Sequence, residues 1–151
     1  MPAIFFDTSA LVKRYDPAEP GADRVRDLCQ RAQGWTLLIA RITPVEVASA
    51  LNRKLREGRF NAARRDQLWQ LFRGHWRDHY RTVALDENIW SHAQRLLFLY
   101  ALRAYDAIQL ASALRVAGVL ADLTADVRLC TADRAQAEAA AGEGLAVELV
   151  G

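Results

Sequence analysis

The chain has 151 residues, of which 52% are hydrophobic and 25% are charged, and these values are typical of one globular domain (residues 1–151) with its own core. No apolar run approaches the roughly 18 residues of a membrane span, and the first residues lack the basic start of a signal peptide, so we expect a cytoplasmic protein with no membrane partner. The net charge of +2 is unremarkable by itself.

Short apolar runs alternate with helical patterns along the whole chain. In chain order the predicted elements are a strand at 3–6, a helix at 22–32, a strand at 36–40, helices at 43–58 and 61–80, a strand at 82–85, a helix from Asp86, a helix at 103–118, a strand at 127–130, a short helix from about Asp133 and a strand at 146–150. Short buried strands separated by helices are typical of an α/β protein whose parallel sheet is covered on both faces.

The helix at 43–58 carries signals at both of its ends. Thr43 is a candidate N-cap, Pro44 fits the first helical position, and Glu46 completes a capping box with Thr43. Gly58 is the expected end of the helix.

Charge is unevenly distributed. Residues 53–81 contain nine Lys or Arg against three acids, whereas residues 82–151 contain five Arg against nine acids. Arg73, Arg77 and Arg81, called the arginine triplet below, recur every four residues in this basic segment. Arginine binds phosphate through paired hydrogen bonds, so the segment could attract a phosphate backbone. The alternative is a solvated helix face, and the Leu, Phe and Trp residues of the same segment could instead dock a partner.

Two cysteines and two histidines are better interpreted as packing residues than as metal ligands. Cys29 and Cys130 are isolated, so we expect two small buried side chains rather than a disulfide or a metal site. His75 and His79 have a spacing that zinc ligands can use, but no third ligand is evident.

Four acids fall where helices begin, and three of them follow a predicted strand. Asp7 follows the first strand, Glu46 opens the helix after the second, Asp133 follows the fourth, and Asp106 opens the helix at 103–118. The carboxyl edge of a parallel sheet is where sites form, and Asp106 reaches it if its helix also begins there. Each acid alone could simply cap a helix. Together, four converging carboxylates would repel one another unless a cation neutralised them. Hard oxygen ligands suit Mg²⁺ or Mn²⁺, which in turn suits phosphoryl chemistry.

Other chemistries lack their motifs. The sequence contains no phosphate-binding P-loop, no glycine fingerprint of a dinucleotide site and no nucleophile elbow. A phosphoacceptor signalling domain would need a lysine late in the chain, and no lysine follows Lys54.

Four segments, "IFFDTSALVKRY", "TPVEVASAL", "YDAIQLASAL" and "LCTADRAQAEAA", resemble the motif regions of PIN-domain ribonucleases, and most of all the VapC-type toxins of bacterial toxin–antitoxin pairs. The resemblance spans nearly the whole chain. It implies a three-layer α/β/α sandwich with a parallel sheet of about five strands, and an Mg²⁺- or Mn²⁺-dependent endoribonuclease.

The resemblance also implies roles for particular residues and partners. Asp7, Glu46, Asp106 and Asp133 match the catalytic and metal-binding acids, and Asp126 is the alternative to Asp133 because "TAD" occurs twice. The hydroxyls that match supporting positions are those of Thr8, Ser9 and Thr131. The implied partners are an RNA substrate, an antitoxin and a second copy of the chain. The remaining alternative is a catalytically inactive PIN-like RNA-binding or scaffold module.

Overall fold

The computed structural model describes residues 2–30, 33–123 and 125–151, and its centre is one parallel sheet with the strand order β3-β2-β1-β4-β5. The strands are β1 (Ala3–Phe6), β2 (Thr36–Ala40), β3 (Tyr80–Val83), β4 (Val127–Thr131) and β5 (Ala146–Leu149). Ala3 of β1 pairs with Thr36 on one side and with Val127 on the other. The strand order therefore reverses at β1, which is the type of position where α/β sheets form binding crevices.

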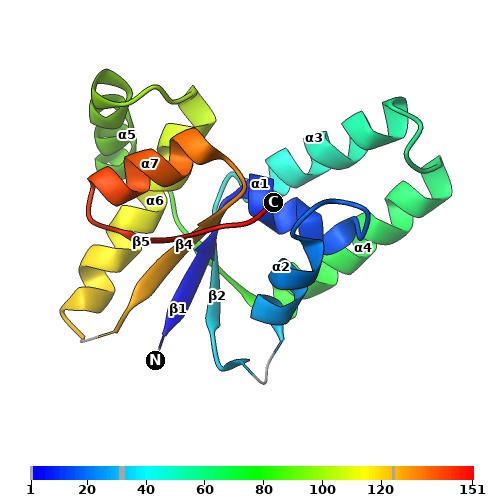
Figure 1. Cartoon of the computed structure of the whole chain (residues 1–151), viewed down its shortest axis with the longest axis horizontal. Coiled ribbons are helices and arrows are strands. Elements are labelled where there is room, and N and C mark those ends of the chain that lie inside the picture. The colour runs from blue at the N-terminus through cyan, green and yellow to red at the C-terminus, as the bar shows by residue number, and fades with distance from the viewer. Residues whose placement is uncertain (1, 31–32, 124) are drawn as a thin grey trace.

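Helices cover both faces of this sheet, as Figure 1 shows. They are α1 (Thr8–Leu11), the 3₁₀ turn η1 (Val12–Tyr15), α2 (Ala22–Cys29), α3 (Thr43–Arg56), α4 (Ala62–Asp78), α5 (Glu87–Leu99), α6 (Ala104–Ala121) and α7 (Arg134–Gly142). The helices α1 to α4 pack on one face and α5 to α7 on the other. The expected three-layer α/β/α sandwich is thus confirmed. None of the described helices is both long and apolar enough to cross a membrane.

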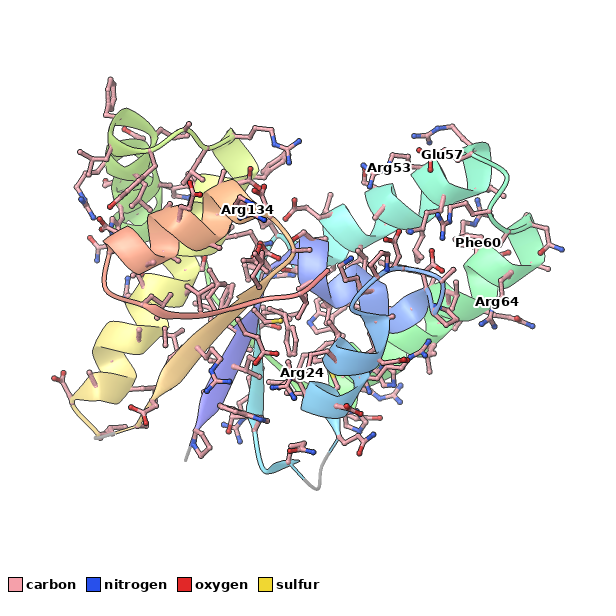
Figure 2. The ribbon with its side chains drawn as sticks, in the orientation of Figure 1. Arg24, Arg53, Glu57, Phe60, Arg64 and Arg134 are labelled. Carbon is pink, nitrogen blue, oxygen red and sulfur yellow. The ribbon has the colours of Figure 1, made fainter. Side chains whose placement is uncertain are left out.

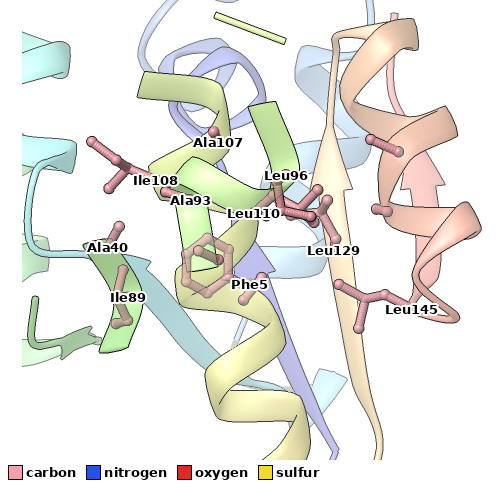
Figure 3. Close-up of a cluster of buried hydrophobic side chains, with 14 of the residues drawn as sticks. Phe5, Ala40, Ile89, Ala93, Leu96, Ala107, Ile108, Leu110, Leu129 and Leu145 are labelled. Carbon is pink, nitrogen blue, oxygen red and sulfur yellow. The ribbon is translucent and has the colours of Figure 1, made fainter. Parts of the chain in front are cut away.

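Alternate residues of β1 supply both halves of the core. Ala3 and Phe5 join the cluster under α5 to α7, whereas Ile4 and Phe6 join the cluster under α1 to α4. Figure 3 shows Phe5 among the side chains of the first cluster, close to α6. Burial on both faces explains why the strands read as continuous apolar runs in the sequence.

The ends of α3 confirm one sequence prediction and contradict another. Gly58 has a φ of 76°, its N–H donates to the Leu55 carbonyl (3.0 Å), and the Arg59 N–H donates to the Lys54 carbonyl (3.0 Å). This is the Schellman end that a glycine permits. The predicted capping box is wrong, because the N-cap is Ile42 and makes no side-chain cap bond. The side chain that was expected to cap, Thr43, is buried and bonds α6 instead.

Other predicted boundaries need correction. The strand predicted at 82–85 is β3 at 80–83, because Tyr80 is buried and its hydroxyl bonds that of Tyr15 at 2.6 Å. The short α1 and η1 after Asp7 were not predicted, because one turn shows no periodicity. The helix predicted at 22–32 ends at Cys29, and residues 31–32 lie outside the described residues.

The cysteines and histidines pack as expected. Cys29 and Cys130 are free and buried, and burial raises the pKa of both thiols. His75 bonds the Tyr15 hydroxyl through Nδ1 (2.8 Å) and stacks on His79. Burial, with smaller contributions from Arg14 and His79, lowers the pKa of His75 to about 4, which keeps the ring neutral.

Candidate active site

Three of the four predicted acids line one cavity at the carboxyl edge of the sheet. Asp7 follows β1, Glu46 lies in the first turn of α3 after β2, and Asp106 lies in the first turn of α6. The helix α6 does begin at this edge, as the sequence argument required. The cavity has a volume of about 730 Å³. Asp133, at the start of α7 after β4, is not among the residues that line it.

Asp7 is the most deeply buried of these acids, with 3% of its surface exposed. Its Oδ1 accepts from the Ser9 hydroxyl (2.6 Å) and the Ala10 N–H (3.1 Å), and its Oδ2 accepts from the Thr131 hydroxyl (2.5 Å). Burial raises the pKa of Asp7 to about 6, although these three hydrogen bonds oppose the rise, and the nearby charge of Asp106 adds to it. Asp7 thus caps α1, as the capping alternative predicts, and its burial makes the charged form costly unless a cation neutralises it.

Glu46 does not cap its own helix. The Thr8 hydroxyl donates to Oε1 (3.0 Å), and the Gln109 amide Nε2 donates to the same oxygen (2.7 Å). Both donors come from other elements, α1 and α6. The carboxylate is therefore held by tertiary contacts at the cavity, which removes the capping-box interpretation of Glu46.

Asp106 fits both interpretations that the sequence left open, a helix cap and an acid of a shared site. Its Oδ2 accepts from the backbone N–H of Arg103 (3.4 Å) and from the Arg103 Nε (3.2 Å), so it does satisfy the helix start. At the same time it lines the cavity with Asp7 and Glu46. The Arg103 side chain is 86% exposed, so this ion pair is weakly held.

Asp133 caps α7, and its Oδ1 accepts from the N–H groups of Ala135 (2.9 Å) and Gln136 (3.3 Å). Its own N–H donates to the Thr131 hydroxyl (3.1 Å), which in turn holds Asp7. Asp133 is therefore linked to Asp7 through Thr131 by its backbone N–H, whereas its side chain caps α7. The alternative acid, Asp126, is exposed and precedes β4, so it belongs to the opposite edge of the sheet.

The donor set fits a hard divalent cation in its chemistry. The hydrogen bonds found on Glu46 all end on Oε1 and those on Asp106 all end on Oδ2, so each carboxylate keeps a second oxygen for a ligand. Within residues 2–30, 33–123 and 125–151, however, no three acidic, histidine or cysteine side chains are grouped closely enough to hold an ion as they stand. The acids share a cavity, and a cation would have to draw them together.

The three predicted hydroxyls all contact the acids. Thr8 bonds Glu46, Ser9 and Thr131 bond Asp7, and the Ser9 and Thr131 oxygens lie 3.3 Å apart. These bonds link the ends of β1 and β4 with α3. The hydroxyls therefore fix the orientation of Asp7 and Glu46.

Most of the basic segment, residues 53–81, lies outside the cavity, and Arg53 is its one residue among those that line it. Arg73 and Arg77 are exposed on α4 beside a separate cavity of about 480 Å³, and Arg77 pairs with Asp78 (2.9 Å). Arg81 lies on β3, because α4 ends at Asp78, so the arginine triplet is not one helical row.

Part of the segment is used inside the fold. Lys54 is buried and pairs with Asp16 (2.7 Å) and Glu19 (2.5 Å), so it is unavailable to a partner. Leu68 and Phe72 are core residues, which contradicts the idea that they dock a partner, whereas Leu71 is exposed.

Several residues that line the cavity were not predicted as site residues, among them Arg53, Arg103 and Gln109. Arg53 lies seven residues after Glu46, two helical turns along the same face of α3, and Arg103 lies three residues before Asp106. These spacings could have identified both arginines. Figure 2 labels Arg53 on α3 and Arg134 at the start of α7, on either side of this end of the sheet.

The chain matches a known protein family over most of its length. Residues 4–141 match the family model described as the PIN domain. A curated relative, "Ribonuclease VapC45" of Mycobacterium tuberculosis, is 34% identical over 122 residues, which cover 77% of this chain and 78% of the relative.

Two solved structures share the fold. The VapBC2 structure from Rickettsia felis, bound to a promoter DNA fragment, has a TM-score of 0.64 at 11% identity and covers 99% of both chains. The VapC20 structure from M. tuberculosis, a toxin that cleaves the sarcin–ricin loop, has a TM-score of 0.61 at 15% identity, with 91% of this chain and 95% of that chain covered. The chain therefore belongs to the PIN-domain family and is similar within it to the VapC ribonucleases.

Proposed function

We propose that this protein is a metal-dependent endoribonuclease toxin that hydrolyses RNA phosphodiester bonds and is neutralised by a cognate antitoxin. The observation that carries the proposal is the cavity that Asp7, Glu46 and Asp106 line, with Asp7 desolvated. The similarity to VapC45, whose name is that of a ribonuclease, supports the reaction class. Free buried cysteines are compatible with the cytoplasm, where we place the activity.

In this proposal Asp7, Glu46 and Asp106 hold Mg²⁺ or Mn²⁺, and Asp133 assists directly or through water. When bound, such an ion supplies a water of lowered pKa and offsets charge on the scissile phosphate. Thr8, Ser9 and Thr131 keep the carboxylates oriented by hydrogen bonding.

Arginine side chains of the chain bind the substrate backbone. Arg53 and Arg103 line the cavity and are exposed, so they can contact the phosphates that flank the scissile bond. The arginine triplet lies outside the cavity and would guide RNA by longer-range attraction.

The antitoxin and a second copy of this chain are the proposed protein partners. Solved relatives of the same fold include a toxin–antitoxin complex from Klebsiella pneumoniae. The end of α5 carries apolar side chains in solvent, Phe98 (92% exposed) and Leu99 (57% exposed). Exposed apolar groups of this kind mark protein interfaces, and we assign them to the homodimer.

The test combines cleavage with metal-dependent stability. We expect the purified protein to cleave RNA in Mn²⁺ or Mg²⁺ and to lose that activity in EDTA. At a Mn²⁺ concentration about 100 times the Kd, mass action should add about 2.7 kcal/mol, which corresponds to roughly 5–10 °C in melting temperature. Cleavage that persists in EDTA, with no melting shift in Mn²⁺, would refute the metal assignment. RNA binding without cleavage under any metal would identify the inactive module.

A further inference from the structure

Gln109 is the most buried polar residue of the cavity, with 1% of its surface exposed. Its amide Nε2 lies 2.7 Å from Glu46 Oε1 and 3.1 Å from the hydroxyl oxygens of Thr8 and Thr43. Gln109 thus ties α6 to α1 and α3. Asp106 lies on α6, Asp7 directly precedes α1, and Glu46 lies on α3, so Gln109 connects the elements of all three acids.

The other end of the same amide is unsatisfied. Gln109 Oε1 is buried and has no hydrogen-bond partner among the described residues. The opposite amide orientation would place Oε1 against the Glu46 carboxylate and is excluded by repulsion between the two oxygens. A residue needed only for packing would be apolar at this position, because a buried, unpaired carbonyl oxygen opposes folding. The amide is therefore explained by the hydrogen bonds of its N–H groups, and the shortest of these, at 2.7 Å, is to Glu46.

We propose that Gln109 is a positioning residue that fixes Glu46 through Oε1 and so leaves Oε2 for the cation. This inference rests on the proposed function. An amide suits the task because it donates hydrogen bonds without carrying charge. A lysine or arginine at the same place would neutralise Glu46 and compete with the metal, whereas a carboxylate would repel it. In metalloproteins, residues that hydrogen-bond a metal ligand on the side away from the metal orient it in this way.

The substitution Gln109→Met keeps the volume of the side chain and removes both the donor and the unpaired oxygen. We expect the metal-free protein to melt within a few degrees of wild type. We also expect the Mn²⁺ Kd, measured by calorimetry on the EDTA-stripped protein, to weaken by about 10–100-fold. In RNA cleavage, kcat should fall while KM for RNA stays unchanged, because no substrate contact is lost.

Ser112→Ala is the control on the same helix. Ser112 is equally buried in α6, but its hydroxyl donates to the backbone carbonyl of Ile108 (2.8 Å) and it is not among the residues that line the cavity. Its loss should leave the Mn²⁺ Kd within about two-fold of wild type, against the 10–100-fold expected at Gln109. If Gln109→Met does not fold, Gln109→Asn serves instead, because the shorter amide remains polar but no longer reaches Glu46.

The outcomes are distinguishable. Wild-type protein that binds Mn²⁺ and cleaves RNA, beside a Gln109 variant with unchanged Mn²⁺ Kd, overturns the positioning role and leaves the proposed function standing. An equal loss of Mn²⁺ affinity in Ser112→Ala also overturns it, because the effect would then come from general loosening of α6. Wild-type protein that binds no Mn²⁺ overturns the proposed function and this inference together.

Discussion

Replacing Asp7 by asparagine should stabilise the metal-free protein at neutral pH and abolish its activity on RNA. Asparagine stays neutral and resembles the protonated acid in shape. Its Oδ1 can keep the bonds from Ser9 and Ala10, and the Thr131 hydroxyl can rotate to accept from the new amide. The substitution thus removes a buried charge and retains the bonds around it.

The magnitude follows from the pKa of Asp7, which burial raises from 3.8 to about 6 in the folded protein. Folding favours the protonated acid, so its contribution to stability is fully present below pH 3.8 and is lost as the pH rises through 6. One pKa unit corresponds to about 1.4 kcal/mol, so at pH values above about 6 the wild type has lost about 3 kcal/mol of its free energy of unfolding. Asp7→Asn does not titrate and keeps that stability. In a chain of this length that is roughly 6–12 °C in melting temperature.

The assay is thermal unfolding in EDTA between pH 4 and pH 7.5. The variant should match wild type near pH 4, exceed it in melting temperature at pH 7.5, and be inactive on RNA. Asp126→Asn, which changes an exposed acid at the opposite edge of the sheet, is the control and should follow wild type throughout. Parallel pH curves for wild type and Asp7→Asn would show that Asp7 carries no desolvated charge.

Three further changes test other parts of the structure. Asp106→Asn and Glu46→Gln should each abolish RNA cleavage yet keep metal-free unfolding within about 1 kcal/mol of wild type, and an active Asp106→Asn would make that acid a helix cap only. Changing the arginine triplet to glutamine should weaken RNA binding and reduce its salt dependence, by up to about 0.9 in the log–log slope per lost phosphate contact, as measured by isotherms at several salt concentrations. Lys54→Met should destabilise the fold in urea unfolding by less than the about 3–5 kcal/mol that breaking an isolated buried ion pair costs, because Asp16 loses Lys54 but keeps Arg59 (2.9 Å); a neutral result would contradict the Lys54–Asp16 ion pair.

The fold was predictable because most of its elements carry their own signals. The strands β1, β2, β4 and β5 are apolar runs bounded by turns, and most of the longer helices show an amphipathic pattern. The start of β3 was misplaced, because Tyr80 follows α4 almost without a break and only tertiary burial assigns it to the sheet. The one-turn α1 was missed for the opposite reason, since it is too short to show a pattern.

In the candidate site, only the residues at the ends of strands and the starts of helices could be predicted. Asp7, Glu46 and Asp106 could be placed at one edge, because parallel topology brings such ends together. Gln109 could not be found in this way, because it looks like a polar interruption of an apolar helix and its partners are 63 to 101 residues away in sequence. Contacts of that kind depend on how α6 packs beside α1 and α3, which single-sequence patterns do not encode.

The central position of β1 has a consequence for incomplete chains. β1, the first strand to be synthesised, pairs with β4, and the Asp7 carboxylate accepts a hydrogen bond from Thr131, which lies 124 residues later. A polypeptide interrupted anywhere before β4 therefore lacks the completed cavity around Asp7 and presents β1 as an open strand edge, which favours aggregation. Under the proposed function, ribonuclease activity would begin only when almost the entire chain has emerged from the ribosome.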